Sequence, residues 1–210
     1  MEVYEKLKQA LLKGSGEDVK MLTQEALRDG ISAADILQKG LIPGFDEIGR
    51  KWDRGEVFIP EVLKSAKAIE GAMVILRPLF IKEGVKPIGT IIIGTVKDDL
   101  HDIGKSIVKM MLEGAGFDVI DLGIDVPADT FVKEARKADP DVIGMSALLS
   151  TTMPNMKKTI EVLCREGITA KVIVGGAPVT KEFAAEIGAA GYGSDAIEAV
   201  AVCRSWLSKS

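Results

Sequence analysis

The sequence predicts an α/β protein with an all-α N-terminal part. Over residues 1 to about 84, apolar residues recur at helical spacing only. From residue 89 onward, short β-branched runs alternate with helical stretches. Strands that alternate with helices in this way indicate βαβ units, and hence a parallel, doubly wound sheet. The pattern changes at Val85-Lys86-Pro87, which indicates a short linker, so we expect one domain at residues 1–86 and another at 87–210.

Four helices are expected in the N-terminal part, and four antiparallel helices with short connections form a bundle. Ser32 is the expected N-cap of the third helix. We expect Pro43 to kink this helix rather than end it, because the apolar pattern resumes at Phe45. The fourth helix is expected to begin near Pro60, a residue favoured in a first turn. The breaks lie at residues 14–16, 29–30 and 54–56, and the fourth helix is expected to stop at Gly84.

Five strands and five helices are expected in the C-terminal part. The expected strands are residues 89–95, 118–122, 142–146 and 171–174, with a weak one near 189–191. The expected helices are residues 103–114, 128–138, 153–166, 180–187 and 194–207. Five parallel strands of this kind fit a flavodoxin-like, Rossmann-type sheet.

Charge and composition exclude several classes of protein. The net charge is −4 and neither part is basic, which argues against a nucleic-acid partner. No apolar run is long enough to span a membrane, and the first residues are acidic, unlike a signal peptide. Cys164 and Cys203 are isolated, so we expect them to be buried apolar residues rather than a redox pair. We therefore expect a cytoplasmic protein without a membrane anchor.

The single histidine, His101, lies in the loop after the first expected strand, two residues after Asp99. A carboxylate beside a metal-bound histidine fixes its tautomer and raises its basicity. In an open α/β sheet, the loops that follow the strands line one site. The other loops carry small and hydroxyl residues at 146–152, Gly175-Gly176, and Gly191–Asp195 after the weak fifth strand. Small residues there leave a slot into which an extended ligand group could reach.

Taken alone, these residues leave other kinds of site open. Asp98, Asp99 and Asp102 resemble the magnesium site of a receiver domain, but Met145-Ser146 stands where a receiver carries its phosphoacceptor. A dinucleotide site would need Gly-x-Gly-x-x-Gly after the first strand, and the sequence has neither this motif nor a P-loop. A Ser-His-Asp hydrolase of this fold would need a Gly-x-Ser-x-Gly elbow, which is absent.

A known family resembles this chain in three short elements, in order and at similar spacing. They are Asp99-x-His101-x-x-Gly104, Ser146-x-Leu148 and Gly175-Gly176. Together they resemble the signature of cobalamin-binding domains that hold the cofactor base-off, with a histidine on cobalt. The helical part resembles the cap module of methionine synthase and of small corrinoid proteins through Gly49-x-x-Trp52-x-x-Gly55-x-x-Phe58-x-Pro60. The resemblance thus covers the whole chain and implies a four-helix cap followed by a cobalamin-binding domain.

The resemblance implies a role for each matching residue. His101 would be the metal ligand on the lower face of cobalt, and Asp99 would be its hydrogen-bonding partner. Thr152 would complete this relay, as a threonine where the better-known pattern has serine, so we expect an altered relay. Phe58 and Val62 of the cap would shield the upper face. The other residues implied to contact the cofactor are Asp98, Leu100, Asp102, Ile103, Gly104, Ser146, Leu148, Ser150, Gly175, Gly176, Gly191 and Tyr192.

The function implied by the resemblance is that of a methyl carrier in a methylamine, methanol or methoxyaromatic methyltransferase system. The chain would carry a methyl group on the cobalt of cobalamin or a related corrinoid. A substrate-specific methyltransferase would supply the group, and a second methyltransferase would pass it to tetrahydrofolate or a thiol. A reductive activation protein is a further implied partner, and the chain itself would be a non-catalytic subunit.

Two alternatives within cobalamin biochemistry remain open at this point. A cobalamin-binding regulator would add a DNA-binding helix-turn-helix and a basic face, and neither is visible in the sequence. The small subunit of an adenosylcobalamin mutase would lack the helical cap. The helical N-terminal part therefore favours the methyl carrier.

Overall fold

The computed structural model describes residues 2–83 and 87–207. It divides into two compact units, Met1–Pro87 with Glu113–Gly116, and Ile88–Leu112 with Phe117–Ser210. The expected stop of the fourth helix at Gly84, and Val85 and Lys86 of the expected linker, lie outside the described residues. In the described part of the chain, no helix combines the length and the apolar character that crossing a bilayer requires.

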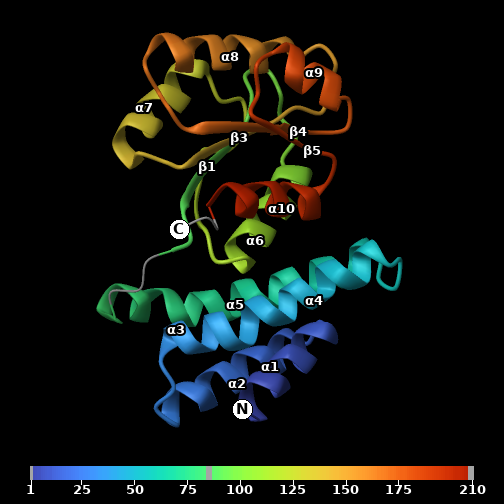
Figure 1. Cartoon of the computed structure of the whole chain (residues 1–210), viewed down its shortest axis with the longest axis vertical. Coiled ribbons are helices and arrows are strands. Elements are labelled where there is room, and N and C mark those ends of the chain that lie inside the picture. Colours follow the sequence, from blue (N-terminus) through green and yellow to red (C-terminus); the bar gives the residue numbers. More distant parts are fainter. Residues whose placement is uncertain (1, 84–86, 208–210) are drawn as a thin grey trace. The chain divides into compact units, whose positions relative to one another are not determined.

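The N-terminal unit consists of helices, as predicted (Figure 1). Its helical segments are α1 (Glu2–Leu12), α2 (Gly16–Arg28), α3 (Ala33–Asp35), the π-helix η1 (Ile36–Leu41), α4 (Ile42–Asp53) and α5 (Ile59–Glu83). Ser32 is the N-cap of α3 and accepts the N–H of Asp35, as its position in the sequence predicts. Buried Ser65 ties α5 to α1, because its hydroxyl donates to the Leu11 carbonyl at 2.7 Å.

The third predicted helix continues through Pro43, since α3, η1 and α4 follow one another without a break. A proline has no N–H and its ring displaces the carbonyl four residues earlier. The turn just before Pro43 is widened to a π-helix over Ile36–Leu41, which takes up this displacement. The helix therefore accommodates the proline and keeps its apolar face.

The C-terminal unit is a five-stranded parallel sheet in the order β2-β1-β3-β4-β5. This confirms the flavodoxin-like prediction. The strands are β1 (Thr90–Thr95), β2 (Asp118–Asp121), β3 (Val142–Ser146), β4 (Lys171–Gly175) and β5 (Gly191–Gly193). The helices are α6 (Ile103–Gly114), α7 (Ala128–Ala138), α8 (Pro154–Arg165), α9 (Lys181–Glu186) and α10 (Ala196–Leu207).

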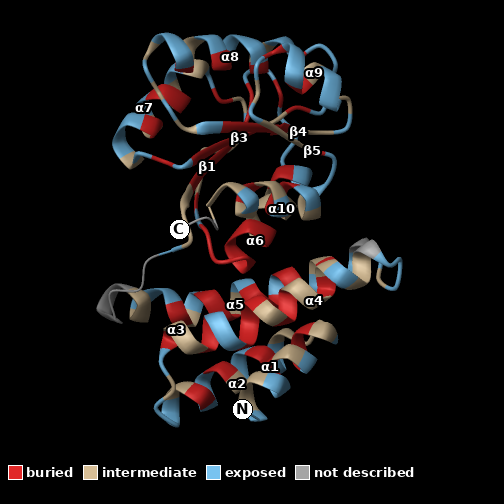
Figure 2. Ribbon diagram, viewed as in Figure 1, coloured by how far each residue is buried: buried red, intermediate tan, exposed pale blue. Residues whose placement is uncertain are grey.

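Helices cover both faces of this sheet, with α7, α8 and α9 on one side and α6 and α10 on the other (Figure 1). The central strands β1 and β3 are therefore buried along nearly their whole length (Figure 2). Ile92, Ile143 and Phe131 belong to the core between the sheet and α7, α8 and α9. A parallel sheet covered in this way leaves the carboxyl ends of its strands as the open edge where a site can form.

Two predictions about single elements were wrong. The fifth strand is Gly191–Gly193 rather than residues near 189–191, so Gly191 and Tyr192 lie within the strand and not in the loop after it. Cys164 is exposed, whereas Cys203 is buried as expected, and burial raises the pKa of its thiol to about 12. The weak strand was misplaced because three residues rich in glycine carry little β-branched signal.

Candidate functional site

Asp99 is the centre of the candidate site, at the carboxyl edge of the sheet. It follows β1 and its side chain is completely buried. A buried carboxylate is costly unless hydrogen bonds satisfy it. Both of its oxygens accept such bonds, one from the loop that holds His101 and the other from the loop after β3. Asp99 thus joins the two loops that carried the expected signature.

The loop after β3 supplies three donors to Asp99 Oδ2. The N–H of Leu148 donates at 2.8 Å and that of Leu149 at 3.4 Å. The hydroxyl of buried Thr152 lies 2.7 Å from Oδ2 and 2.9 Å from the Leu149 carbonyl. A hydroxyl has one proton, and the carboxylate is the stronger acceptor, so Thr152 donates to Asp99. The expected relay hydroxyl is therefore in contact with Asp99, although it is a threonine.

These bonds keep Asp99 ionised. Burial is the largest single influence and would raise the pKa of its carboxyl. The hydrogen bonds from Thr152, Leu148 and His101 together outweigh burial and hold the pKa well below its ordinary value of 3.8. Asp99 is consequently an acceptor only, at any pH near neutrality.

His101 turns one ring nitrogen toward this carboxylate, because its Nδ1 lies 3.0 Å from Asp99 Oδ1. Since ionised Asp99 can only accept, Nδ1 carries a proton, and the tautomer of neutral imidazole that this bond selects has its lone pair on Nε2. The backbone N–H of His101 donates to the same oxygen at 3.1 Å. The imidazole side chain is 49% exposed, so Nε2 is available to a ligand from outside. An imidazole whose Nδ1 is hydrogen-bonded to a carboxylate is the arrangement that metal-binding histidines use.

The loop between β1 and α6 is held by its neighbours at several further points. Asp98 has a positive φ of 66°, and its N–H donates to Asp125 Oδ1 at 2.7 Å. Lys97 Nζ lies 2.6 Å from the same oxygen, and Asn155 of α8 donates to the Lys97 carbonyl at 2.7 Å. The N–H of Asp125 donates to the Asp99 carbonyl at 3.0 Å. The loop that carries His101 is thus fixed by residues that follow β2 and β3.

Large apolar side chains are exposed at the same edge of the sheet as His101. Among the described residues, five of the eight large hydrophobic side chains that are exposed lie on the loops after β1, β2 and β3 or at the start of α6. They are Leu100, Ile103, Ile124, Leu148 and Leu149, which we call the apolar rim. Exposed apolar side chains gathered at one edge indicate a surface that a ligand or partner covers. Leu100, Ile103 and Leu148 were expected at the cofactor, whereas Ile124 and Leu149 were not.

Ile124 was missed because the loop after β2 carries no part of the recognised signature. The signal that could have found it is its place between Gly123 and Asp125, where an isoleucine follows the carboxyl end of a strand. The Gly123 carbonyl accepts the N–H of Thr95 at 3.0 Å, which places this loop beside the loop that carries His101.

A buried ion pair lies at the start of α6. The Lys105 side chain is only 1% exposed, and its Nζ lies 2.5 Å from Asp121 of β2 and 2.9 Å from Asp102. Burial would raise the pKa of Asp121, but the hydrogen bonds from Lys105 and from the Gly123 N–H lower it on balance. Asp102, expected at the cofactor, therefore pairs with Lys105, and its pKa is lowered mainly by that bond.

The remaining loop residues fall at the same edge. Ser146 ends β3 beside Thr95 of β1 and Gly175 of β4, and Ser150 is exposed. A Cβ on Gly176 would lie 1.9 Å from the Ala147 carbonyl oxygen, and its φ is 127°, so no other residue fits there. Gly176 is thus required by the close approach of two loops. Gly104, by contrast, is open, because a Cβ there would meet no atom within 4 Å.

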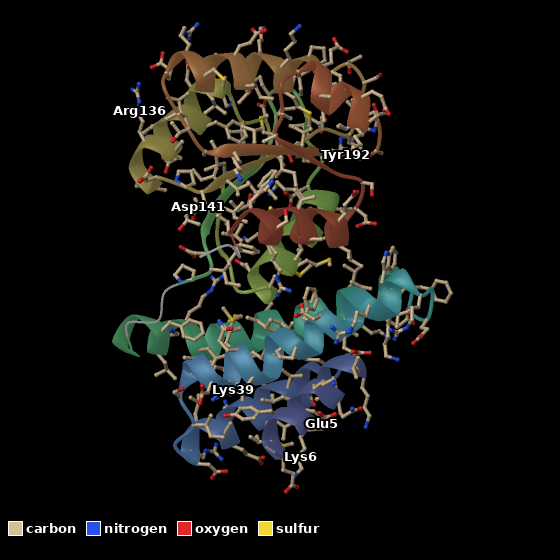
Figure 3. All side chains as sticks on the ribbon, viewed as in Figure 1. Glu5, Lys6, Lys39, Arg136, Asp141 and Tyr192 are labelled. Carbon is tan, nitrogen blue, oxygen red and sulfur yellow. The ribbon has the colours of Figure 1, made fainter. Side chains whose placement is uncertain are left out.

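The other expected site residues lie in different settings. Tyr192 is half-buried in β5 against the sheet core (Figure 3), and a Cβ on Gly191 would meet the Trp206 ring at 2.7 Å. In the helical unit, Phe58 is 68% exposed and its N–H donates to Glu61, whereas Val62 is 4% exposed. Phe58 is therefore accessible to a ligand or partner, and Val62 is not.

Comparisons with known proteins match both parts of the chain. Residues 89–201 and residues 3–77 each match a family described as a B12 binding domain. The chain is 40% identical to a corrinoid protein of Desulfitobacterium hafniense (strain Y51), covering 100% of this chain and 99% of the relative. It is also 40% identical to trimethylamine corrinoid protein 1 of Methanosarcina acetivorans, covering 98% and 97%. The structure is similar to the methanol:cobalamin methyltransferase complex MtaBC of Methanosarcina barkeri, with a TM-score of 0.86, 29% identity, and coverage of 100% of this chain and 81% of that one.

Fold and site together define a helical bundle followed by an α/β domain that presents one histidine at the carboxyl edge of its sheet. The chain belongs to the B12-binding family of corrinoid proteins.

Proposed function

We propose that this chain binds cobalamin or a related corrinoid base-off, with His101 as the lower axial ligand, and carries a methyl group between two methyltransferases. The observation that carries the proposal is the exposed imidazole of His101, held by buried Asp99 inside the apolar rim. A metal ligand with its carboxylate partner, at an edge that also exposes large apolar side chains, suits a flat ring-shaped cofactor that carries its own metal.

The donor set fits such a cofactor. Among residues 2–83 and 87–207, no three His, Cys, Asp or Glu side chains gather as a metal site of protein ligands requires. His101 would therefore supply one ligand, and the remaining ligands would come from the cofactor itself. When bound, the cobalt of the corrinoid supplies the position that accepts and releases the methyl group.

The residues of the chain prepare the site for the cofactor in three ways. Asp99 keeps the proton on Nδ1 of His101, so that Nε2 presents its lone pair to the metal. Thr152 and the Leu148 N–H hold Asp99 in place, so the imidazole has a fixed orientation. The apolar rim removes water from the surface around His101 when a corrinoid covers it.

The proposed partners are a substrate-specific methyltransferase and an acceptor methyltransferase that uses tetrahydrofolate or a thiol, with a reductive activation protein as a third. Support comes from relatives named as trimethylamine and dimethylamine corrinoid proteins, which this chain matches over nearly its full length. Because the matches include the helical part, they favour a methyl carrier over a mutase subunit that lacks it.

The helical unit has a separate part in the proposal, in which Phe58 shields the reactive face of the bound cofactor. The support for this role is that the Phe58 ring is exposed just before α5. The Phe58 N–H donates to the Glu61 carboxylate, which holds the backbone there. Phe58→Ala should leave cobalamin binding unchanged and speed reoxidation of the reduced cofactor by air. Val74→Ala, on an exposed side chain of α5, is the control, and equal rates in the two variants would remove Phe58 from the proposal.

A transfer assay tests the carrier role. The chain is loaded with methylcobalamin, freed of unbound cofactor by gel filtration, and mixed with a thiol with or without a purified acceptor methyltransferase of a methylamine system. A carrier should retain the cofactor and release the methyl group only when the methyltransferase is present. Methyl release to the thiol by the chain alone, at the same rate, would instead identify it as an enzyme in its own right.

A further inference from the structure

Thr95 places a buried hydroxyl against the backbone of His101. It is the last residue of β1, it is completely buried, and its Oγ1 donates to the His101 carbonyl at 2.9 Å. Threonine suits the strand because it is β-branched, but its hydroxyl needs a partner when it is buried. The partner here is the carbonyl of the proposed cobalt ligand.

The backbone of Thr95 is held by the strands and loops on both of its sides. Its N–H donates to the Gly123 carbonyl at 3.0 Å, and its carbonyl accepts the N–H of Val126 at 2.9 Å. On the other side it is paired with Ser146, whose carbonyl accepts the N–H of Val96 at 3.0 Å. The hydroxyl therefore projects from a backbone that is hydrogen-bonded on both sides, which is what precise positioning of a second group requires.

Three hydrogen bonds then fix His101. Asp99 holds the ring through Nδ1 and the backbone through the N–H, and Thr95 holds the carbonyl. The two bonds from Asp99 act on the ring and on the N–H side of His101. Thr95 acts on the carbonyl side, so the Cα from which the imidazole projects is held by hydrogen bonds on both sides.

We propose that Thr95 is a positioning residue that sets the orientation of His101 for binding to cobalt. This inference rests on the proposed function, since it concerns the same ligand. Thr95 acts only through His101, because its hydroxyl is buried and its bond is made to a backbone atom. The quantity that it controls is the equilibrium between the states with His101 on and off the metal.

Thr95→Val is the direct test, because valine keeps the shape and removes the hydroxyl. Wild type and variant are loaded with cobalamin, reduced to the Co(II) form, and compared by electron paramagnetic resonance, in which an axial nitrogen splits the cobalt lines. Loss of one neutral hydrogen bond should lower the ratio of His-on to His-off protein about 3- to 10-fold. Thr95→Ser keeps the hydroxyl and should stay within about 2-fold of wild type.

Thr23→Val is the matched control, because the Thr23 hydroxyl is also buried and donates to a backbone carbonyl, that of Val19, in α2. It should leave the spectrum as in wild type. Thr95→Cys places a weaker donor of similar size at this position, so its ratio of His-on to His-off protein should lie between those of the serine and valine variants. If Thr95→Val does not fold, the comparison of Thr95→Cys with Thr95→Ser tests the inference in its place. An unchanged ratio in Thr95→Val, or an equal change in Thr23→Val, overturns the inference. A wild-type spectrum without nitrogen splitting overturns the proposed ligation itself.

Discussion

The Thr152 hydroxyl lies 2.7 Å from the Asp99 carboxylate, although 53 positions separate the two residues in the chain. This contact joins the loops after β1 and β3 and makes the orientation of His101 depend on a residue that is not its neighbour in sequence. The structure thereby forms a chain of hydrogen bonds from the turn that precedes α8 to the imidazole.

Thr152→Val should weaken binding of His101 to cobalt, because Asp99 Oδ2 would then keep only the Leu148 and Leu149 N–H groups. Substitution of a residue that hydrogen-bonds to a metal ligand typically lowers metal affinity about 10- to 100-fold. Thr152 bonds to Asp99 rather than to His101 itself, so we expect a smaller decrease, about 3- to 10-fold, in the ratio of His-on to His-off protein. The absorption spectrum of the cobalamin-loaded protein measures the His-on fraction. Thr152→Ser, which restores the residue of the better-known pattern, should match wild type within about 2-fold, and a serine variant as weak as valine would contradict the relay.

Lys105→Met should destabilise the apoprotein by about 2–3 kcal/mol, because it leaves Asp121 without its closest partner in a mostly buried position. The measurement is urea unfolding at pH 7. Lys109→Met is the control in the same cluster, since its Nζ lies 3.5 Å from Asp121 and the side chain is more exposed. Lys109→Met should lower the free energy of unfolding by no more than about 1 kcal/mol. Equal losses of unfolding free energy in the two variants would show that the buried pair of Lys105 and Asp121 stabilises the fold no more than the contact of Lys109 with Asp121.

The contribution of Asp121 should depend on pH in a defined direction. Its pKa is lower in the folded protein than the ordinary value of 3.8, so the ionised form favours folding. Its contribution is therefore fully present about one pH unit above 3.8 and fades as the pH falls through the lowered value. The difference in unfolding free energy between wild type and Asp121→Asn should shrink between pH 5 and pH 3. A difference that stays constant or grows over this range would show that the pKa is not lowered.

Gly104→Ala should separate stability from cofactor binding. A Cβ at this position in the first turn of α6 meets no atom, so the apoprotein should keep its stability or gain up to about 0.5 kcal/mol. Cobalamin retention on gel filtration should nevertheless fall about 10-fold, because the family resemblance implies that Gly104 contacts the cofactor. Gly16→Ala, at the start of α2, should change neither property appreciably. Full retention by Gly104→Ala would take this residue out of the proposed site.

The sequence predicted the sheet and its edge well because β-branched runs and glycine breaks are local signals. The buried strand that ends at Thr95 and the loop that follows it were both visible in this way. The π-turn before Pro43 was not, because the response of a helix to proline depends on the packing around it. The burial of Lys105 could not be predicted either, because its partner Asp121 belongs to a different element, β2, and a lysine is usually exposed.

Within the candidate site, the resemblance to a family supplied what periodicity could not. It singled out Asp99, His101 and Thr152, and the structure brings the three into hydrogen-bonding contact. It did not supply Ile124 or Thr95, because neither belongs to the recognised motif. Both become visible only when the loops after β1 and β2 are seen side by side, joined by the bond from the Thr95 N–H to the Gly123 carbonyl.

The most direct measurement is the absorption spectrum of the purified chain reconstituted with cobalamin, compared with that of His101→Ala. Wild type should bind the cofactor base-off with a histidine on cobalt. The variant should lose the histidine signature, while its apoprotein should keep its stability because the imidazole is half exposed. A base-off, His-on spectrum that persists unchanged in His101→Ala would contradict the central claim.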